Sequence, residues 1–446
     1  MITNCVVRAG SVILGSLLLA TLVSVSAHGA TYYVAMSGSD ANPGTEAQPW
    51  RTIQKAADTL FAGDTVYVKE GTYNESVIPQ NSGSSGNYIT YSAYLGDTVT
   101  IDGTGISWDW WGGLFHIQKE YIKVSGLRVI NSTGAGIFAW RSSHIIIEKN
   151  CTYDTWSSGI GVWDSNEITV DGNDVELACN GDGHECITVA NSSNFEIKNN
   201  HVHHAGPPGP PPWGGGEAID TKGSTNGKVY RNHVHDIPNG MGIYVDAYDK
   251  DVCDIDVYGN IVHDCPGQGI CLATETGGTL KNVRVYNNIV YNMGMGGFAV
   301  FPFPGVHKNF KIINNIFYNN RDGINVVYTE IQNIVIRNNI LSKNDNQIRA
   351  NAPDILTVDH NLIDGRTEIY GSEYVEGNPR FVNPSEADFH LKEDSPAIDN
   401  GSAVDAPGDD FDGNPRPQGA EYDIGAFEFM ESQVNGSSKS RRLHQN

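Results

Sequence analysis

The sequence predicts an all-β fold, a right-handed parallel β-helix with a cap at each end. Two sequence patterns recur along the chain at intervals of roughly 22 to 32 residues, which is the range of solenoid repeats. Each interval has room for three short strands and for no long helix. The chain also contains 50 glycines, and this abundance favours many short strands separated by turns.

The first pattern is an alternating apolar strand that ends in asparagine and is followed by a short apolar pair. Asparagines stacked at one turn hydrogen-bond to their equivalents in the neighbouring coils, and such a ladder holds parallel strands in register. The turn preference of asparagine alone does not explain its return at one constant phase. The asparagines at this position are Asn150, Asn173, Asn200, Asn232, Asn260, Asn288, Asn315, Asn339 and Asn361.

The second pattern is approximately Gly-Ile-x-Val. Strand side chains alternate between two faces, so the Ile and the residue two positions later both point into the coil. The inward column contains Ile137, Ile160, Ile187, Ile219, Ile243, Ile270, Phe298 and Ile324. The residues between and just after the inward positions therefore define the outer face of one sheet, coil by coil.

The two ends of the chain depart from the repeat. Residues 1–30 are predicted to be a secretory signal peptide, because a basic start precedes an apolar stretch that is too short to span a bilayer and ends in small residues. A helical stretch near Thr52–Leu60 is expected to protect the edge of the first coil. From the predicted signal peptide we expect a secreted protein. We also expect a monomer that does not associate with a membrane. The expected divisions are 31–100 for the N-terminal cap and first coils, 101–380 for the β-helix, 381–430 for the C-terminal cap and 431–446 for a disordered tail.

The cysteines of an exported protein are expected to form disulfides. Two pairs would each close a short Gly-containing loop, and two cysteines, Cys151 and Cys253, are left over. The spacing that is typical of zinc sites is missing. The preferred pairs are Cys179 with Cys186 and Cys265 with Cys271.

The formal net charge of the chain is −23. This charge argues against nucleic acid as a partner, because a phosphate backbone requires a basic surface. It also argues against a polyanionic substrate unless a bound cation reverses the local field.

Two glutamates, Glu185 and Glu217, stand two residues before the inward Ile on adjacent coils. Strict alternation would turn them inward. We assume that the chain bends before the strand and that they face outward, because two carboxylates inside the coil would cost far more. Carboxylates on adjacent coils lie about 4.8 Å apart and repel unless a proton, a base or a cation compensates them. Converging carboxylates suit Ca²⁺, so Glu185, Glu217 and Asp220 are the predicted calcium ligands.

Three further charged residues extend this outward patch over three coils. Asp220 lies between the two inward positions of its strand. Lys222 and Asp246 occupy the column directly after the second inward position, on adjacent coils. A lysine among carboxylates is either a catalytic group or an exposed partner of Asp220 or Asp246 in an ion pair.

Aromatic residues continue the patch as a predicted substrate-binding surface. Trp140 and Trp163 stand in the same column as Lys222, toward the N-terminal end, and exposed aromatic faces are what sugar rings stack on. The alternative is a patch covered by a loop. Trp213 lies in a Pro- and Gly-rich insertion that is expected to form a wall of the site, and Tyr248 is expected to contact the substrate.

The segment from Glu217 to Asn226, which contains Asp220 and Lys222, resembles the catalytic stretch of polysaccharide lyase family six, the alginate lyases and chondroitinase B. The resemblance implies that Glu217 binds Ca²⁺ and that Lys222 is the catalytic base. Family nine pectate lyases are similar in plan. The sequence departs from family six at Asp246, where that family has an arginine.

The resemblance implies a calcium-assisted lyase that cleaves a uronate-containing polysaccharide by β-elimination. Such a reaction needs a cation on the uronate carboxylate, a base for the neighbouring C–H and an acid for the leaving oxygen. Lys222 is the expected base, and Tyr244 or Tyr248 is the expected acid.

Three alternatives use the same groove. A glycoside hydrolase would use Asp220 and Asp246 as an acid and a base or nucleophile. A C5-epimerase would share the first step of the lyase. A non-catalytic glycan-binding protein would use the surface alone.

A histidine column lies elsewhere on the coils, three residues after the ladder asparagine. His203, His235 and His263 occupy it, and tyrosines continue it at Tyr291 and Tyr318. Because the column changes between histidine and tyrosine, we interpret it as a structural stack and not as a metal site.

Overall fold

A computed structural model describes residues 29–108, 111–181, 184–206, 216–238, 240–326, 331–351 and 353–430. The predicted signal peptide up to residue 28, the predicted tail at 431–446 and Trp213 lie outside the described residues. No helix in the described ranges is both long and apolar enough to cross a membrane.

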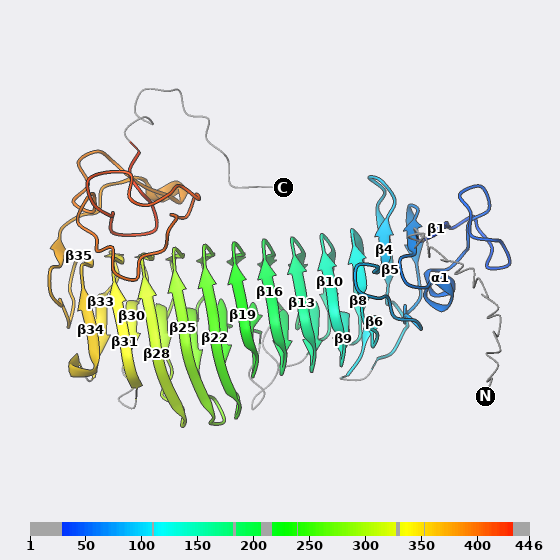
Figure 1. Cartoon of the computed structure of the whole chain (residues 1–446), viewed down its shortest axis with the longest axis horizontal. Coiled ribbons are helices and arrows are strands. Elements are labelled where there is room, and N and C mark those ends of the chain that lie inside the picture. Colours follow the sequence, from blue (N-terminus) through cyan, green and yellow to red (C-terminus); the bar gives the residue numbers. More distant parts are fainter. Residues whose placement is uncertain are drawn as a thin grey trace, which may run out of the picture.

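The chain forms a right-handed parallel β-helix, as the sequence predicts. Three parallel sheets run along the long axis of the molecule (Figure 1), and each coil contributes one strand to each sheet over most of the length. Apolar side chains of all three sheets point inward and form one continuous core.

The first sheet contains, in spatial order, β1 (Thr31–Val34), β2 (Thr65–Val68), β4 (Ile89–Ala93), β7 (Ile122–Ser125), β10 (Ser143–Glu148), β13 (Asn166–Asp171), β16 (Ser193–Lys198), β19 (Thr225–Tyr230), β22 (Asp251–Tyr258), β25 (Thr279–Tyr286), β28 (Val306–Ile313), β31 (Ile331–Arg337) and β34 (Leu356–Asp359). The second sheet contains β3 (Gly71–Tyr73), β5 (Val99–Asp102), β8 (Leu127–Ser132), β11 (Cys151–Thr155), β14 (Asp174–Glu176), β17 (His201–His203), β20 (His233–His235), β23 (Ile261–His263), β26 (Ile289–Tyr291), β29 (Ile316–Tyr318), β32 (Ile340–Ser342), β35 (Leu362–Asp364) and β36 (Val375–Glu376). The third sheet contains β6 (Gly113–Ile117), β9 (Ala135–Trp140), β12 (Ile160–Trp163), β15 (Ile187–Ala190), β18 (Ile219–Asp220), β21 (Ile243–Asp246), β24 (Gln268–Ala273), β27 (Gly296–Val300), β30 (Asp322–Val326) and β33 (Asn346–Ala350).

The register of the third sheet matches the predicted inward column. Ile137, Ile160, Ile187, Ile219 and Ile243 pair directly from coil to coil, and all five are fully buried. Because this column faces the core, the residue after each Ile faces away from it.

The predicted asparagine ladder is confirmed from Asn150 to Asn361. Asn260 shows the pattern of an interior member. Its backbone N–H and side-chain amide both donate to the Asn288 side-chain oxygen, at 3.0 and 2.9 Å. The amide also donates to the Val229 carbonyl at 2.9 Å, and the Asn260 side-chain oxygen accepts two bonds from Asn232. Every polar group of the side chain is thus paired away from water.

The predicted helical stretch forms α1 (Ile53–Thr59). Thr52 is its N-cap, and the Thr52 hydroxyl accepts the Lys55 backbone N–H at 3.1 Å. Ile53, Ala56 and Ala57 are buried in the core next to the first coil. This amphipathic turn therefore shields apolar side chains at the N-terminal end of the β-helix.

Residues 381–430, which the sequence predicts as the far cap, pack on the outer face of the second sheet. The segment contains the antiparallel pair β37 (Phe381–Asn383) and β38 (Asp388–Leu391), with the 3-10 turn η2 (Pro384–Glu386) between them. A second 3-10 turn, η1 (Pro353–Ile355), precedes β34 in the β-helix. Its apolar residues cluster with outward residues of the last coils, which are Ile289, Ile316, Ile340 and Leu362. The segment thus folds back along the flank of the helix (Figure 1).

The predicted disulfides are wrong. Cys186, Cys265 and Cys271 carry free thiols, so neither preferred pair is bonded. Cys265 packs in the interior core, whereas Cys271 packs with Tyr244 in a separate cluster on the outer face of the third sheet. The strand therefore lies between the two sulfurs that the loop spacing predicted to be paired.

Candidate active site

Five of the predicted site residues meet on the outer face of the third sheet, around β15, β18 and β21. We call Glu185, Glu217, Asp220, Lys222 and Asp246 the acid–lysine cluster. The Glu185 carboxylate accepts a hydrogen bond at 2.9 Å from Thr188, which belongs to the outward column. This contact shows that the chain bends before β15. The outward orientation that the sequence analysis assumed for Glu185 is therefore the one observed.

Lys222 lies between two carboxylates. Its Nζ donates to Glu185 Oε1 at 2.7 Å and lies 3.6 Å from Asp220 Oδ2. The Nζ atom also stands 5.0 Å from the centre of the Tyr248 ring, within the range of a cation–π contact. The Lys222 side chain is 17% exposed, so these partners replace most of its water. Its main ion-pair partner is Glu185, on the preceding coil.

The aspartates of the cluster are buried without a full set of partners. Asp220 is fully buried, and neither of its carboxylate oxygens accepts a hydrogen bond from any described residue. Asp246 Oδ1 accepts the backbone N–H groups of Tyr248 and Glu275 at 3.1 and 2.9 Å. Asp246 Oδ2 has no such donor within the described ranges. Buried carboxylate oxygens of this kind are compensated by a proton, a cation, a water molecule or a ligand.

The electrostatics of the cluster follow from burial and from its excess of acids. Burial, reinforced by the Glu185 charge, raises the pKa of Glu217 to about 7. Burial also raises the pKa of Asp220 well above its usual range, against the attraction of Lys222. For Glu185 the balance is reversed. Burial alone would raise its pKa, but the adjacent Lys222 ammonium outweighs burial and lowers it. The acids are therefore driven toward different protonation states.

The same carboxylates hold the proton on Lys222. Burial alone would lower the pKa of Lys222, but the charges of Glu185 and Asp220 raise it above its ordinary value. As it stands, Lys222 is an ammonium, and it becomes a base only if those charges are neutralised.

The two predicted tyrosines differ in environment. Tyr244 pairs with Asp220 in the outward column and packs with Cys271, Ala273 and Ala299, so burial raises its pKa. Tyr248 is 39% exposed and lies beside Lys222. Tyr248 is thus the phenol that a ligand reaches from solvent.

The predicted aromatic surface is partly occupied by protein contacts. The Arg141 guanidinium stands 4.4 Å from the Trp140 ring, and the Trp140 indole N–H donates to Asp164 at 3.0 Å. Trp163 meets Trp111 edge to face at 5.0 Å between ring centres, and Trp111 is 49% exposed. Trp163 with Trp111 is therefore the more open aromatic surface.

Sequence reasoning missed three residues near the cluster. Trp111 lies outside the repeat, and its only sequence signal is the run of tryptophans from Trp108 onward. His184 directly precedes Glu185, and its charge favours the ionised form of that acid. Glu275 follows β24 in a loop, and burial raises its pKa. None of the three belongs to an aligned column.

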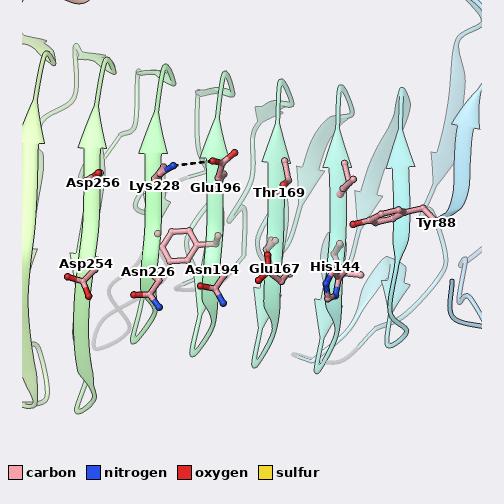
Figure 2. A pocket seen from close by; sticks show the side chains of 15 residues that line it. Tyr88, His144, Glu167, Thr169, Asn194, Glu196, Asn226, Lys228, Asp254 and Asp256 are labelled. Carbon is pink, nitrogen blue, oxygen red and sulfur yellow. Dashed lines mark ion pairs between the residues drawn. The ribbon is translucent and has the colours of Figure 1, made fainter. Parts of the chain in front are cut away.

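A separate recess lies on the first sheet and not on the third. Its volume is about 540 Å³, and two rows of side chains line it across neighbouring strands (Figure 2). One row contains His144, Glu167, Asn194, Asn226 and Asp254, and the other contains Thr169, Glu196, Lys228 and Asp256. The recess and the acid–lysine cluster are thus on different faces of the β-helix.

Two family models match the chain. Residues 32–201 match the model described as "Pel9A-like, right handed beta helix region", and residues 180–363 match the model described as "right handed beta helix region". The Pel9A-like match includes Glu185 and ends before Lys222. Both descriptions agree with the fold.

Similar sequences cover part of the chain. A protein of Bacillus subtilis, described as uncharacterized protein YwoF, is 34% identical over 150 residues, 31% of this chain and 32% of that protein. Pectate lyase PEL9 of Emericella nidulans is 33% identical over 143 residues, 29% of this chain and 35% of that protein. The chain thus spans about a third of the length of these curated relatives. The resemblance to polysaccharide lyases that the sequence predicts is confirmed.

Among solved structures, that of XylC with xylose is similar over most of the chain. The TM-score is 0.62 at 13% identity, and the match covers 90% of this chain and 98% of XylC. At this identity the likeness concerns the fold.

Proposed function

We propose that the protein is a secreted polysaccharide lyase that cleaves a uronate-containing polysaccharide by β-elimination, with Lys222 as the base. The observation that carries the proposal is the position of Lys222 Nζ, 2.7 Å from Glu185 and 3.6 Å from Asp220 in a cluster rich in buried acids. The sequence relationship to pectate lyase PEL9 supports the same class of reaction.

The charge of the cluster supports a bound cation. Glu185, Glu217, Asp220 and Asp246 outnumber the one ammonium of Lys222, and a buried excess of negative charge is unstable unless protons or a cation compensate it. The orphaned oxygens of Asp220 and Asp246 fit a hard cation such as Ca²⁺, which prefers carboxylate ligands.

The ligand set that these contacts favour differs slightly from the set predicted by sequence. Both Glu185 oxygens are already used, one by Lys222 and one by Thr188. Glu217, Asp220 and Asp246 are therefore the residues that would hold Ca²⁺, and Glu185 orients Lys222. When bound, Ca²⁺ would neutralise these acids and the uronate carboxylate, which favours loss of the sugar proton and of the Lys222 proton.

The remaining roles follow from position. Neutral Lys222 Nζ would take the proton from the carbon next to the uronate carboxyl. The Tyr248 hydroxyl, which reaches solvent beside Lys222, would give a proton to the leaving oxygen. Tyr244 would support the wall of the site from within its apolar cluster. Trp163 and Trp111 would stack against a neighbouring sugar.

A hydrolase is the second candidate, and one observation favours it. Burial raises the pKa of both Asp220 and Asp246, and a protonated carboxyl beside an ionisable one is the arrangement of an acid and a base in glycoside hydrolysis. In that case Lys222 would be an ion-pair partner of the carboxylates and would not act as a base.

The product of the reaction separates the two candidates. We would incubate the protein with polygalacturonate, alginate, chondroitin and neutral xylan, and measure ultraviolet absorbance of a C4–C5 double bond together with new reducing ends. We expect unsaturated product from a uronate polymer, and we expect Lys222→Ala to lower the rate by about 10²- to 10⁴-fold, the range for loss of a general base.

Lys228→Ala is the matched control, because Lys228 also pairs with a glutamate but lies on the first sheet. It should retain the wild-type rate. Saturated products, with Asp220→Asn or Asp246→Asn as the inactivating change, would replace the lyase by the hydrolase.

A further inference from the structure

The second sheet carries two identical His-Val-His strands on adjacent coils. In β17 and β20, His201 pairs with His233 and His203 pairs with His235, while the valines between them are buried in the core. All four histidines therefore project from the outer face of the second sheet, away from the acid–lysine cluster.

The ring stacking predicted in one of these columns is confirmed, whereas the interpretation that the column is not a metal site is not tested by it. The rings of His203 and His235 are parallel within 12° at 5.3 Å, and those of His235 and His263 within 13° at 5.0 Å. Tyr291 continues the stack at 4.6 Å from His263. The neighbouring column, His201 and His233, was not predicted from sequence and brings additional ring nitrogens to the stack.

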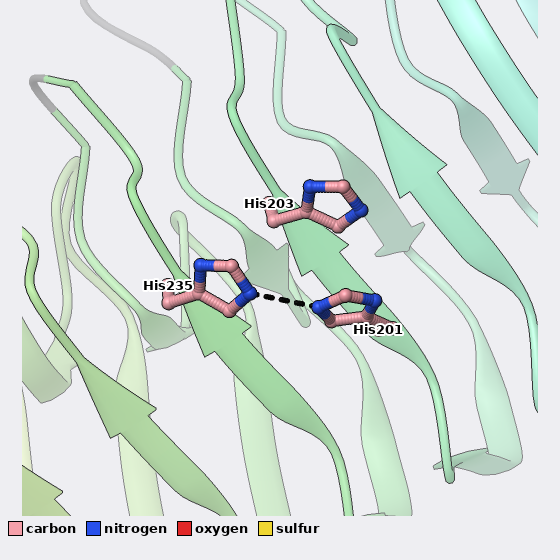
Figure 3. A group of neighbouring side chains, drawn as sticks. All are labelled: His201, His203 and His235. Atoms are coloured by element: carbon pink, nitrogen blue, oxygen red, sulfur yellow. Dashed lines mark hydrogen bonds between the residues drawn. The ribbon is translucent and has the colours of Figure 1, made fainter. Parts of the chain in front are cut away.

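A short contact joins the two columns. His201 Nε2 lies 2.8 Å from His235 Nε2 (Figure 3). Figure 3 also shows His203 beside this pair, and one ring nitrogen from each of His201, His203 and His235 lies within 4.8 Å of the others.

The other ring nitrogens of the pair determine where the hydrogens are. His235 Nδ1 lies 2.7 Å from Asp236 Oδ2, and His201 Nδ1 lies 3.3 Å from Asp174 Oδ1. Because an ionised carboxylate only accepts hydrogen bonds, each Nδ1 carries the hydrogen. In two neutral imidazoles the facing Nε2 atoms are then both lone pairs, which repel at 2.8 Å. A positive species between them removes this repulsion.

We propose that His201, His203 and His235 bind a divalent late transition-metal ion of the Zn²⁺, Ni²⁺ or Cu²⁺ class. Imidazole nitrogens are preferred ligands of these ions, and they bind through an unprotonated nitrogen. Asp236 and Asp174 orient His235 and His201 through Nδ1, opposite the facing Nε2 atoms, which is the usual outer-shell arrangement around metal-bound histidine. Asp174 also contacts His203 Nε2, so His203 would bind the ion through Nδ1, which faces His204 Nδ1 at 2.6 Å and must turn from it.

The adjustment that the His201–His235 pair requires is small, and His203, whose nitrogen lies within 4.8 Å of the others, must move closer. Two imidazole nitrogens bound to one tetrahedral Zn²⁺ at about 2.0 Å lie about 3.3 Å apart. The observed 2.8 Å is shorter, so the rings need to separate by about half an ångström. His201 is 39% exposed, whereas His203 is 11% and His235 15% exposed, so an ion enters past His201.

A shared proton is the competing occupant, and the surroundings disfavour it. Burial and neighbouring imidazoles lower the pKa of His235, and they lower that of the adjacent His233 to about 3. His233 Nε2 also faces His263 Nε2 at 2.8 Å, and His263 Nδ1 faces Asp264, so the arrangement recurs one coil further. Several protons on one row of stacked rings would repel each other.

The test is a titration of the chelator-treated full-length protein with Zn²⁺, followed by calorimetry. Excess Ca²⁺ is present throughout, so that sites made of carboxylates are occupied and the result does not depend on the proposed lyase site. We expect about one Zn²⁺ per chain, or two if the His233–His263 pair also binds. The double variant His201→Gln/His235→Gln should weaken binding at the first site by more than about 100-fold.

His390→Gln is the matched control, because His390 also contacts two carboxylates, Asp388 and Asp412, but no second histidine is among its described partners. It should bind Zn²⁺ like the wild type. Melting of the double variant in chelator reports whether it folds.

A second measurement needs no variant. Cu²⁺ bound to the wild-type protein should show nitrogen hyperfine coupling from imidazole in its electron paramagnetic resonance spectrum. Absence of Zn²⁺ binding, unchanged binding by the double variant, or a Cu²⁺ spectrum with oxygen ligands alone would overturn the proposal.

Discussion

The asparagine ladder and the acid–lysine cluster are both stacks of buried polar side chains on successive coils, but they differ in how those groups are paired. In the ladder, Asn260 donates to Asn288 and Val229 and accepts from Asn232, so its amide is fully used. In the cluster, both Asp220 oxygens and one Asp246 oxygen lack a hydrogen bond from the described residues.

This difference distinguishes the structural stack from the proposed site. A buried polar group that is fully paired stabilises one structure, whereas an unpaired group costs free energy that only a ligand or a proton restores. The fold therefore gains stability along the ladder and gives up stability at the cluster.

The largest expected effect is that of calcium on the cluster. Free Ca²⁺ at about 100 times its dissociation constant should raise the free energy of unfolding by about 2.7 kcal/mol, because it binds the folded chain alone. Melting temperature with Ca²⁺ and with chelator measures this, and Asp220→Asn should abolish the difference. Equal melting of the wild type in both conditions would remove the metal from the cluster.

The ladder should respond to loss of one member and not to calcium. Asn260→Ala should lower the free energy of unfolding by about 1 to 3 kcal/mol, because amide partners on both neighbouring coils lose their hydrogen bonds. Chemical denaturation in chelator and in Ca²⁺ should give the same loss. An unchanged midpoint would contradict the view that the ladder is buried and fully paired.

The opposite sign is expected when an unpaired acid of the cluster is neutralised. In chelator, Asp220→Asn should raise the free energy of unfolding by about 1 kcal/mol, because it removes a buried carboxylate without hydrogen-bond donors. The same variant should be inactive. A destabilised Asp220→Asn with normal melting cooperativity would indicate that Asp220 stabilises the fold through Lys222.

A pH dependence is also expected of the cluster and not of the ladder. Burial raises the folded-state pKa of Glu217 from 4.5 to about 7, so the folded chain keeps a proton that the unfolded chain releases. Glu217 therefore makes stability fall as the pH rises from 4.5 to about 7. The melting-temperature difference between Glu217→Gln and the wild type should grow over this range. The difference between Asn260→Ala and the wild type should stay constant, because the ladder asparagine does not titrate.

The sequence was sufficient for the features that depend on a repeated local pattern. The alternation of Ile137 and its equivalents specifies an inward face, and the asparagine at one phase specifies the turn, so register follows from the period. The outward neighbours Asp220 and Lys222 could be placed from the same alignment. Helix α1 was predictable because Thr52 caps a short amphipathic stretch.

Other features depend on the three-dimensional arrangement of segments that are distant in sequence. Lys222 pairs with Glu185 of the preceding coil, and the bend before β15 that allows this contact has no signature in the alternation. Cys265, in the turn before β24, packs in the interior core, whereas Cys271, on β24, packs on the outer face. The facing nitrogens of His201 and His235 join two columns that occupy different positions of the sequence repeat.

The physical reason is the range of the interactions. Inward and outward positions within a strand are set by backbone geometry over a few residues, and the sequence by itself determined them. The angle at each corner, the fold-back of residues 381–430 onto the second sheet, and the partner of each buried charge are set by packing between coils and by the free energy of desolvation. Those features were decided only by the tertiary structure.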